Sequence, residues 1–224
     1  MIIDIQQSSA TLSDMTRAAN LCGVILAAGA SSRMGRDKAL LPWPPPPAGE
    51  TAHFPGETFL SAAIHALARH TEMVIVVAGH NTATLAPVVY AEGASLVTNP
   101  DPSRGQFSSL QVGLQEVLNR GRDAAFVTLV DRPPAREDTL ASLRGAFLDS
   151  SAQVWAVVPA FGNKHGHPVV VGRELIEVFL KAPPNVTGRD IEHQHQEHIL
   201  YLPVDDPFVT LNIDTPEEYA ALQT

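Results

Sequence analysis

The chain alternates short, continuously apolar runs with segments in which hydrophobic residues recur at helical spacing. Such runs are typical of strands buried on both faces, and the periodic segments are typical of helices that bury one face. The pattern predicts strands at residues 21–28, 73–78, 95–98 and 124–130, and helices at residues 58–70, 82–91, 108–119 and 137–148. This βαβ order indicates a largely parallel sheet with helices on both faces.

The second half of the chain is less regular. Residues 154–159 and 168–171 are typical of strands joined by a turn, and residues 199–203 and 208–211 are typical of short strands. We therefore expect an antiparallel or mixed addition to the sheet. The predicted fold is a single-domain, Rossmann-like three-layer α/β sandwich, mostly parallel, with a mixed C-terminal part.

One segment interrupts the alternation, because residues 42–56 hold six of the chain's 18 prolines. Proline lacks the amide hydrogen that helices and sheets use, so regular structure is not expected there. We interpret the segment as an exposed insertion loop with the character of a stiff surface connection. It is expected to be dispensable for folding.

Composition narrows the class of protein. Apolar residues make up 45% of the 224 residues and charged residues 17%, which is typical of a globular domain. The 24 acidic and 15 basic residues give a net charge of −9, which argues against broad binding to nucleic acid or to an anionic membrane. An anionic ligand must therefore be captured by a local group of cations.

The sequence also suggests a compartment. Cys22 is the single cysteine, so an internal disulfide is impossible. Residues 1–20 lack a basic start followed by an apolar core, and no run approaches the ~18 apolar residues of a membrane span. These features favour the cytoplasm.

A loop of small residues carrying cations follows the first predicted strand. Gly29 permits a tight turn, Ser31 and Ser32 add hydroxyl donors, and Arg33 and Lys38 supply positive charge. It is not a Walker loop, because no Ser or Thr follows Lys38. The residues fit a phosphate-binding loop, with a plain surface turn as the alternative.

Longer motifs strengthen the first interpretation. The string LAAGASSRMGRDKALLP, residues 26–42, closely resembles the signature LAxGxSxRMGxxKxLLP of nucleotidyltransferases that make nucleoside-diphosphate sugars and cofactors. Further motifs follow in the family's order: TNP at 98–100, GQFSSL at 105–110, VDRP at 130–133, GHP at 166–168 and NIDTPEEY at 212–219. The chain is most similar to the molybdopterin nucleotidyltransferases, which convert molybdenum cofactor into its cytosine or guanine dinucleotide. This resemblance divides the chain into an N-terminal extension, residues 1–20, and a nucleotidyltransferase domain, residues 21–224.

The reaction implied by the resemblance joins two polyanions. An acceptor phosphate attacks the α-phosphorus of a nucleoside triphosphate, which requires cations and a divalent metal but no Ser, Cys or His nucleophile. The resemblance implies that Arg33, Lys38 and Asp131 are the catalytic groups. It also implies a nucleotide-binding set made up of Leu26, Ala27, Ala28, Gly29, Arg33, Lys38, Asn99 and Ser109.

Two carboxylates are candidate ligands for Mg²⁺. Asp131 directly follows the predicted strand 124–130, at the edge of the sheet where open α/β folds bind ligands, although an Asp before proline also forms turns. Asp214 precedes Thr215 and Glu218, which form a predicted capping box, so Asp214 is equally suited to helping begin the last helix. The resemblance implies that both carboxylates hold magnesium, which prefers hard oxygen ligands.

The two residues before Gly29 bear on which nucleotide base the protein uses. Guanylyltransferases of the resembled family usually carry two glycines where this chain has Ala27 and Ala28, and the two methyl groups favour the smaller cytosine ring. We therefore expect CTP as the nucleotide and a molybdopterin-type acceptor, with His167 lining the acceptor pocket or serving as a structural turn residue. A molybdoenzyme that receives the product is a further expected partner.

Some residues depart from the family pattern. Arg132 replaces a Gln that is usual in the cytidylyltransferases, and it either grips an anionic acceptor, repels magnesium or points outward. Phe107 stands where Met is common. His193, His195 and His198 are expected on a polar, solvated helix. The alternative is a zinc site, but only His195 and His198 have a spacing that lets them share a ligand, so the solvated helix is favoured.

Two alternatives to the leading function remain. The first alternative is an enzyme of the same fold with a different acceptor pocket, which transfers the nucleotide to a sugar 1-phosphate or another phosphorylated metabolite. A non-catalytic nucleotide-binding module or molybdenum cofactor chaperone is the alternative from a different class. Two metal-binding carboxylates together with two cations argue for catalysis, because a binding module has little use for the carboxylates.

Overall fold

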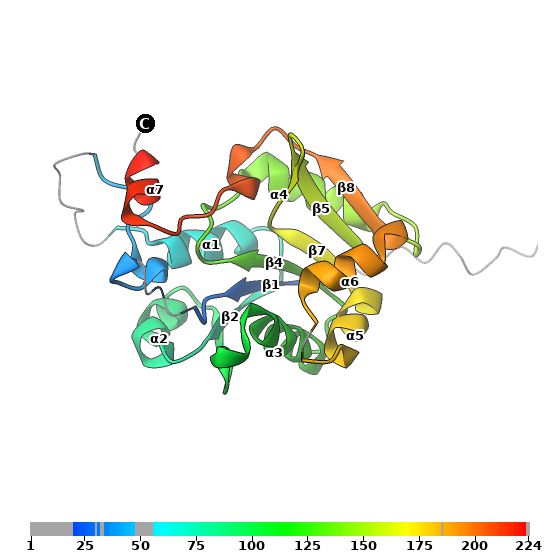
Figure 1. The fold of residues 1–224 in the computed structure, drawn as a ribbon, viewed down its shortest axis with the longest axis horizontal. Coiled ribbons are helices and arrows are strands. Elements are labelled where there is room, and N and C mark those ends of the chain that lie inside the picture. Colours follow the sequence, from blue (N-terminus) through cyan, green and yellow to red (C-terminus); the bar gives the residue numbers. More distant parts are fainter. Residues whose placement is uncertain (1–19, 30, 32–33, 48–55, 185, 223–224) are drawn as a thin grey trace, which may run out of the picture.

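The computed structural model describes residues 20–29, 31, 34–47, 56–184 and 186–222. An eight-stranded sheet lies at the centre with helices on both sides (Figure 1). The strand order is β3-β2-β1-β4-β7-β5-β6, and β8 pairs with β5. The strands are β1 (Leu21–Leu26), β2 (Met73–Ala78), β3 (Ser95–Thr98), β4 (Ala124–Leu129), β5 (Ala156–Phe161), β6 (Lys164–His165), β7 (Val169–Gly172) and β8 (Ile199–Pro203).

The sheet has a parallel part and a mixed part. β1 pairs in parallel with β2 and β4, and β2 pairs in parallel with β3. β7 then runs antiparallel to both β4 and β5, while β5 and β8 are parallel. This arrangement confirms the predicted three-layer α/β fold with a mixed C-terminal part.

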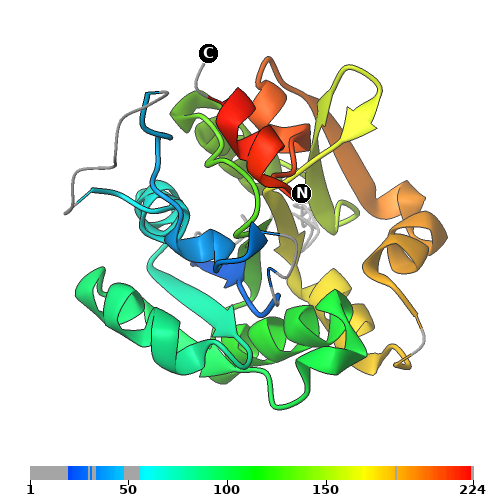
Figure 2. The same ribbon diagram turned by 60° about the vertical axis from the view of Figure 1, so that its left-hand side comes forward.

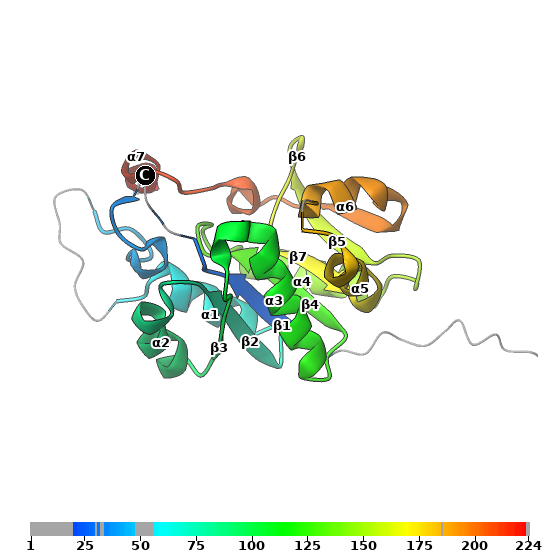
Figure 3. The same ribbon diagram turned by 60° about the horizontal axis from the view of Figure 1, so that its bottom comes forward.

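Helices cover each face of the sheet and bury a separate hydrophobic cluster (Figure 3). One face carries α1 (Phe59–Ala68), α2 (Thr82–Ala91) and α4 (Glu137–Leu148). The other face carries α3 (Gln106–Asn119), α5 (Arg173–Lys181) and α6 (Gly188–Gln194). α3 packs so closely that a Cβ atom on Gly113 would lie 2.7 Å from Val24 Cγ1, so glycine is required there.

The last helix, α7 (Pro216–Ala221), lies near the segment that follows β1 (Figure 2). Tyr219 belongs to a small hydrophobic cluster with Met34, Leu41, Phe59 and Ile213. The Tyr219 hydroxyl donates a hydrogen bond of 2.7 Å to the carbonyl of Pro42. The C-terminal end of the domain therefore closes over its beginning.

The predicted strand at residues 208–211 is wrong. This segment belongs to the 3-10 helix η5 (Pro207–Thr210). Pro207 has no amide hydrogen, and Asp206 accepts a hydrogen bond of 3.1 Å from the amide of Phe208, so the chain turns instead of pairing with a strand.

The prediction of an exposed proline-rich loop needs correction at its beginning. Pro42 forms an isolated bridge with Thr58, and the amide of Trp43 donates to the carbonyl of Glu57 at 2.8 Å. The Trp43 ring packs edge-on against Phe59, with ring centroids 5.0 Å apart. Proline removes amide donors but leaves carbonyls and neighbouring side chains free to contact the domain, so this end is anchored. Residues 48–55 lie outside the described residues.

No helix in the described part of the chain is long and apolar enough to cross a membrane.

Candidate active site

The loop after β1 is held tightly at the carboxyl edge of the sheet. The Ala27 amide donates to the carbonyl of Val77 on β2 at 2.8 Å, and the Val130 amide donates to the carbonyl of Leu26 at 3.1 Å. The predicted nucleotide-binding loop thus lies between the ends of β2 and β4. Open α/β sheets bind their ligands at this edge.

Asn81 and Asp37 brace this loop, and sequence analysis missed both. The Asn81 side-chain amide donates to the Ala27 carbonyl at 2.9 Å and to Asp37 Oδ2 at 2.7 Å. Its oxygen accepts from the amide of Gly79 at 3.0 Å. The signal that could have found Asn81 is its position shortly after the end of β2. Because β2 is parallel to β1, both strands end at the same edge of the sheet.

Lys38 lies between the two predicted metal ligands. Its Nζ atom is 2.7 Å from Asp214 Oδ1 and 3.6 Å from Asp131 Oδ2. Lys38 is only 9% exposed, because it begins the short 3-10 helix η2 (Lys38–Leu40), whose neighbours Ala39 and Leu41 are buried. The fold therefore brings together three residues that are far apart in the sequence and that sequence analysis named.

Asp131 has the environment of a group that needs a further partner. Its carbonyl accepts from the amide of Ile213 at 2.9 Å, which places residue 214 beside it. Its Oδ1 atom is buried and makes no hydrogen bond to the described residues. A buried, unpaired carboxylate oxygen beside a second carboxylate fits a hard divalent cation such as Mg²⁺.

The backbone of Asp214 takes part in starting the last helix, as its sequence context predicted. Glu218 Oε2 accepts from the amides of Asp214, at 2.6 Å, and Thr215, at 3.0 Å. Thr215 and Glu218 form the capping box, with Pro216 in the first turn. This cap fixes the backbone while the Asp214 side chain faces Lys38, so the two interpretations of Asp214 are compatible.

The remainder of the cationic loop is only partly described. Ser31 has a positive φ of 48°, and its hydroxyl accepts a hydrogen bond of 3.1 Å from the amide of Lys38. Ser31 thereby fixes the start of η2. The predicted catalytic and nucleotide-binding role of Arg33 concerns a residue outside the described residues.

Asn99 and Ser109 are paired with each other. Each is 3% exposed, and the Asn99 side-chain amide donates to Ser109 Oγ at 2.9 Å and to Ser108 Oγ at 2.8 Å. Its oxygen accepts from the amide of Asp101 at 3.0 Å. These bonds fix the turn from β3 into α3, and the nucleotide-binding role of Asn99 and Ser109 stays a prediction.

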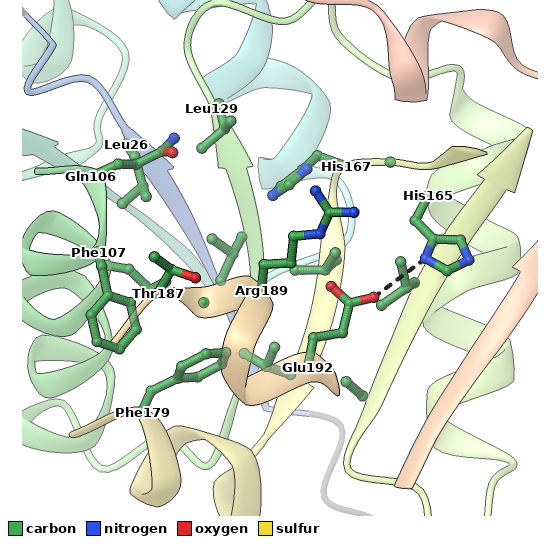
Figure 4. Close-up of a pocket in the computed structure, with 18 of the residues that line it drawn as sticks. Leu26, Gln106, Phe107, Leu129, His165, His167, Phe179, Thr187, Arg189 and Glu192 are labelled. Carbon is green, nitrogen blue, oxygen red and sulfur yellow. Dashed lines mark ion pairs between the residues drawn. The ribbon is translucent and has the colours of Figure 1, made fainter. Parts of the chain in front are cut away.

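A cavity of about 930 Å³ lies over β1, β4, β7 and β5 (Figure 4). Arg132, which follows Asp131 in the chain, lines it. Its apolar lining includes Leu26, Phe107, Val127, Leu129, Val158 and Phe179. Its cationic lining consists of Arg104, Arg132, Lys164 and Arg189. An apolar floor with several cations suits a flat organic molecule that carries an anionic group.

Arg132 and His167 are fixed at the wall of this cavity by the same atom. The carbonyl of Val209 accepts from Arg132 Nη1 at 2.9 Å and from the amide of His167 at 2.8 Å. A Cβ atom on Gly166 would lie 2.2 Å from this carbonyl, so only glycine permits the contact. Of the three interpretations of Arg132, the outward-pointing one is excluded, because Arg132 lines the cavity.

Burial governs the protonation of both side chains. It lowers the pKa of His167 to about 3, with help from the neighbouring Arg132 charge. It also lowers the pKa of Arg132, against the opposing charges of Asp131 and Asp214. Because the imidazole of His167 is neutral at physiological pH, it offers the cavity a hydrogen bond and not a charge.

The expected polar helix that carries the histidines is shorter than predicted. α6 ends at Gln194, so His193 lies on it and His195 beyond it, while His198 ends the 3-10 helix η4 (Gln196–His198). The His198 ring stacks on Trp155, with centroids 3.8 Å apart. His198 Nδ1 also donates a hydrogen bond of 2.8 Å to the carbonyl of Gln153, and His195 packs tilted against the same indole.

The fold is shared with solved nucleotidyltransferase structures. The crystal structure of Rv0371c from Mycobacterium tuberculosis superposes with a TM-score of 0.73, covering 91% of this chain and 98% of that one at 23% identity. A nucleotidyl transferase from Methanothermobacter thermautotroptrophicus, Mth528, gives a TM-score of 0.72 at 20% identity over 91% of this chain and 96% of that one.

Sequence comparison identifies the family. Residues 23–199 match the model of the MobA-like NTP transferase domain, and the chain belongs to this family. The "Molybdenum cofactor cytidylyltransferase" of Escherichia coli is 24% identical over 88% of this chain and 92% of its own length. The "Probable molybdenum cofactor guanylyltransferase" of Rhodopirellula baltica is 34% identical over 60% of this chain and 59% of its own length. The protein is therefore a nucleotidyltransferase of the MobA-like type.

Proposed function

We propose that the protein transfers CMP from CTP to the phosphate of a molybdopterin-type acceptor and releases pyrophosphate. The observation that carries this proposal is the cluster of Lys38, Asp131 and Asp214 beside a cavity lined by cations. Charge is the main requirement of the reaction, because both reactants are polyanions.

Asp131 and Asp214 are the residues that would hold Mg²⁺. When bound, the metal supplies positive charge to the triphosphate. The buried Oδ1 of Asp131, which makes no hydrogen bond to the described residues, and the hard oxygen chemistry of both side chains support this assignment. Lys38 then contributes a second positive charge at the same place.

The chain's own residues position the reactants. In the proposed reaction an acceptor phosphate oxygen forms a bond to the α-phosphorus of CTP as the bond to the bridging oxygen of pyrophosphate breaks. The phosphate is already ionised at neutral pH, so no general base is needed. We assign Lys38, with Arg33, to the phosphates of the nucleotide, and Arg132 with His167 to the acceptor.

The choice of CTP rests on the loop after β1. A Cβ atom placed on Gly79 would lie 3.2 Å from the Ala28 methyl group and 3.2 Å from Pro102 Cβ, so the loops after β1, β2 and β3 meet at Ala28. Ala27 is 1% exposed and packs in the hydrophobic core, so its methyl group does not reach this region. The methyl group of Ala28 narrows the region relative to glycine and favours a pyrimidine. Named relatives include both a cytidylyltransferase and guanylyltransferases, so the choice of CTP depends on Ala28.

Pyrophosphate release tests the proposal. The protein is supplied with Mg²⁺, one of CTP, GTP, ATP or UTP, and molybdopterin, a sugar 1-phosphate or no acceptor. We expect release with CTP and molybdopterin. Release with the sugar phosphate alone would identify a different acceptor, and binding of CTP without any release would indicate a non-catalytic module.

A further inference from the structure

The charge of the cavity is uneven. Against its four Arg and Lys residues, Glu192 is the one carboxylate among the described residues that line it. A carboxylate is an unfavourable neighbour for a phosphate. Its presence therefore indicates a second polar feature of the ligand, one that donates hydrogen bonds.

Glu192 is held in place by residues from two other elements. The Tyr201 hydroxyl on β8 donates to Glu192 Oε1 at 3.0 Å, and His165 Nδ1 on β6 lies 3.3 Å from the same oxygen. The rings of His165 and Tyr201 stack with centroids 4.0 Å apart, which fixes both donors. A carboxylate held in this way loses little conformational freedom when a ligand binds.

The second oxygen of Glu192 remains available to a ligand. Oε2 makes no hydrogen bond to the described residues, and the side chain is 27% exposed. Figure 4 shows Glu192 projecting from α6 among the cavity residues, with the dashed ion pair to His165 on one side. One oxygen is thus anchored while the other faces the cavity.

Glu192 and Arg132, which follows Asp131, line the same cavity from different elements. Arg132 follows β4, whereas Glu192 is on α6 and is tied to β8 and β6. The strand order from β4 through β7 and β5 to β8 puts three strand spacings between the β4 and β8 backbones. A ligand with its phosphate at Arg132 therefore extends across the sheet toward Glu192.

We propose that Oε2 of Glu192 accepts a hydrogen bond from the 2-amino group of the acceptor's pterin ring. This inference rests on the proposed function, because it takes a pterin as the acceptor. A pterin carries adjacent N–H donors on its 2-amino-4-oxopyrimidine edge, and the aromatic side chains of Phe107 and Phe179 supply an apolar surface in the same cavity. Glu192 is then a specificity residue that distinguishes pterins from other phosphorylated acceptors.

Binding of two simple rings tests this role without catalysis. Lumazine lacks the 2-amino donor of pterin, because it carries an oxo group, an acceptor, at position 2 and a hydrogen on N1. We expect wild-type protein to bind pterin about 10- to 100-fold more tightly than lumazine, as for a hydrogen bond to a charged group. Glu192→Gln is expected to lose most of this preference, and Tyr201→Phe part of it.

The control is Glu197→Gln, a change at a side chain that is 68% exposed, which is expected to keep the preference. Thermal unfolding shows whether each variant is folded. An unchanged preference in folded Glu192→Gln would overturn the inference, as would a wild-type KM for molybdopterin in that variant. Failure of the proposed function gives a different result, namely no transfer to molybdopterin by the wild-type protein.

Discussion

The parallel and the mixed parts of the sheet differ in how their sites are built. In the parallel part, β3, β2, β1 and β4 end at one edge, and each following loop adds groups to the nucleotide side of the site. The cavity is assembled from strands of both parts together with α3, α5, α6, β6 and η5, and its residues are dispersed along the chain. The proposed chemistry is thus encoded in contiguous motifs, whereas the proposed acceptor site depends on side chains dispersed along the chain.

The C-terminal segment connects the two parts. The carbonyl of Val209 fixes Arg132 and His167 at the cavity, and the amide of Ile213 bonds to Asp131. Asp214 then pairs with Lys38. Substitutions on either side of this segment are therefore expected to affect the two parts separately.

Asp131→Asn is expected to lower kcat by about a thousandfold, or ~4 kcal/mol, because the amide keeps the shape of the side chain but carries no charge for a metal. Pterin binding in the mixed part should be unchanged. Steady-state pyrophosphate release across a range of Mg²⁺ concentrations measures the effect, with the exposed Asp123→Asn as the matched control. Activity near the wild-type level would reduce Asp131 to a turn residue.

Asp206→Ala is expected to lower the free energy of unfolding by about 3 kcal/mol. The Asp206 carboxylate is fully buried and accepts hydrogen bonds from the Arg136 amide, the Thr139 hydroxyl and the Phe208 amide, all of which lose their partner. The neighbouring Asp205 is exposed, so Asp205→Ala is the control. Urea unfolding compares the two variants, and equal stability would contradict the role given to Asp206.

Trp43→Ala is expected to destabilise the domain by about 2 kcal/mol, less than for a fully buried aromatic residue, because Trp43 is half-buried. Its ring contacts Phe59 from the parallel part and Phe208 from η5, so the loss affects the junction between the parts. Tyr90→Ala, at a residue 64% exposed, is the control in thermal unfolding. Equal melting temperatures for the two variants would show that the contacts made by the first residues of the proline-rich segment do not stabilise the domain.

His65→Gln is expected to have the smallest effect, below about 1 kcal/mol, because the ring is partly exposed. The hydrogen bond to Glu57, joined by one to Glu92, raises the pKa of His65 against the opposing effect of burial. Because its pKa is raised in the folded state, His65 stabilises the protein fully at pH values below the ordinary His pKa of ~6.5. This stabilisation is lost as the pH rises through the pKa of the folded state. Unfolding of the wild type and His65→Gln should therefore differ more at about pH 6 than at about pH 9, with the exposed His193→Gln as control.

The elements that sequence predicts well are those whose pattern is local. β2, α2, β3, α4 and β8 have the predicted bounds, because continuous or periodic burial marks them directly. The error at residues 208–211 has a long-range cause, since η5 depends on Asp206, whose carboxylate is held by the distant amide of Arg136.

The site shows the same division. Lys38, Asp131 and Asp214 were named from motifs, and the fold brings them together. Asn81 and Glu192 stand in no such motif, and each is held by residues of other elements: Asn81 by Ala27 and Asp37, Glu192 by His165 and Tyr201. Pairing between distant side chains is a property of the folded chain, so spacing in the sequence did not reveal it.

The identity of the dinucleotide formed shows whether the protein transfers CMP to molybdopterin. Wild-type protein is incubated with Mg²⁺, equal concentrations of CTP and GTP, and molybdopterin, and the dinucleotide formed is identified by mass spectrometry. The proposed function predicts the cytosine dinucleotide as the main product, together with pyrophosphate. Formation of only the guanine dinucleotide, or of no dinucleotide at all, would contradict it.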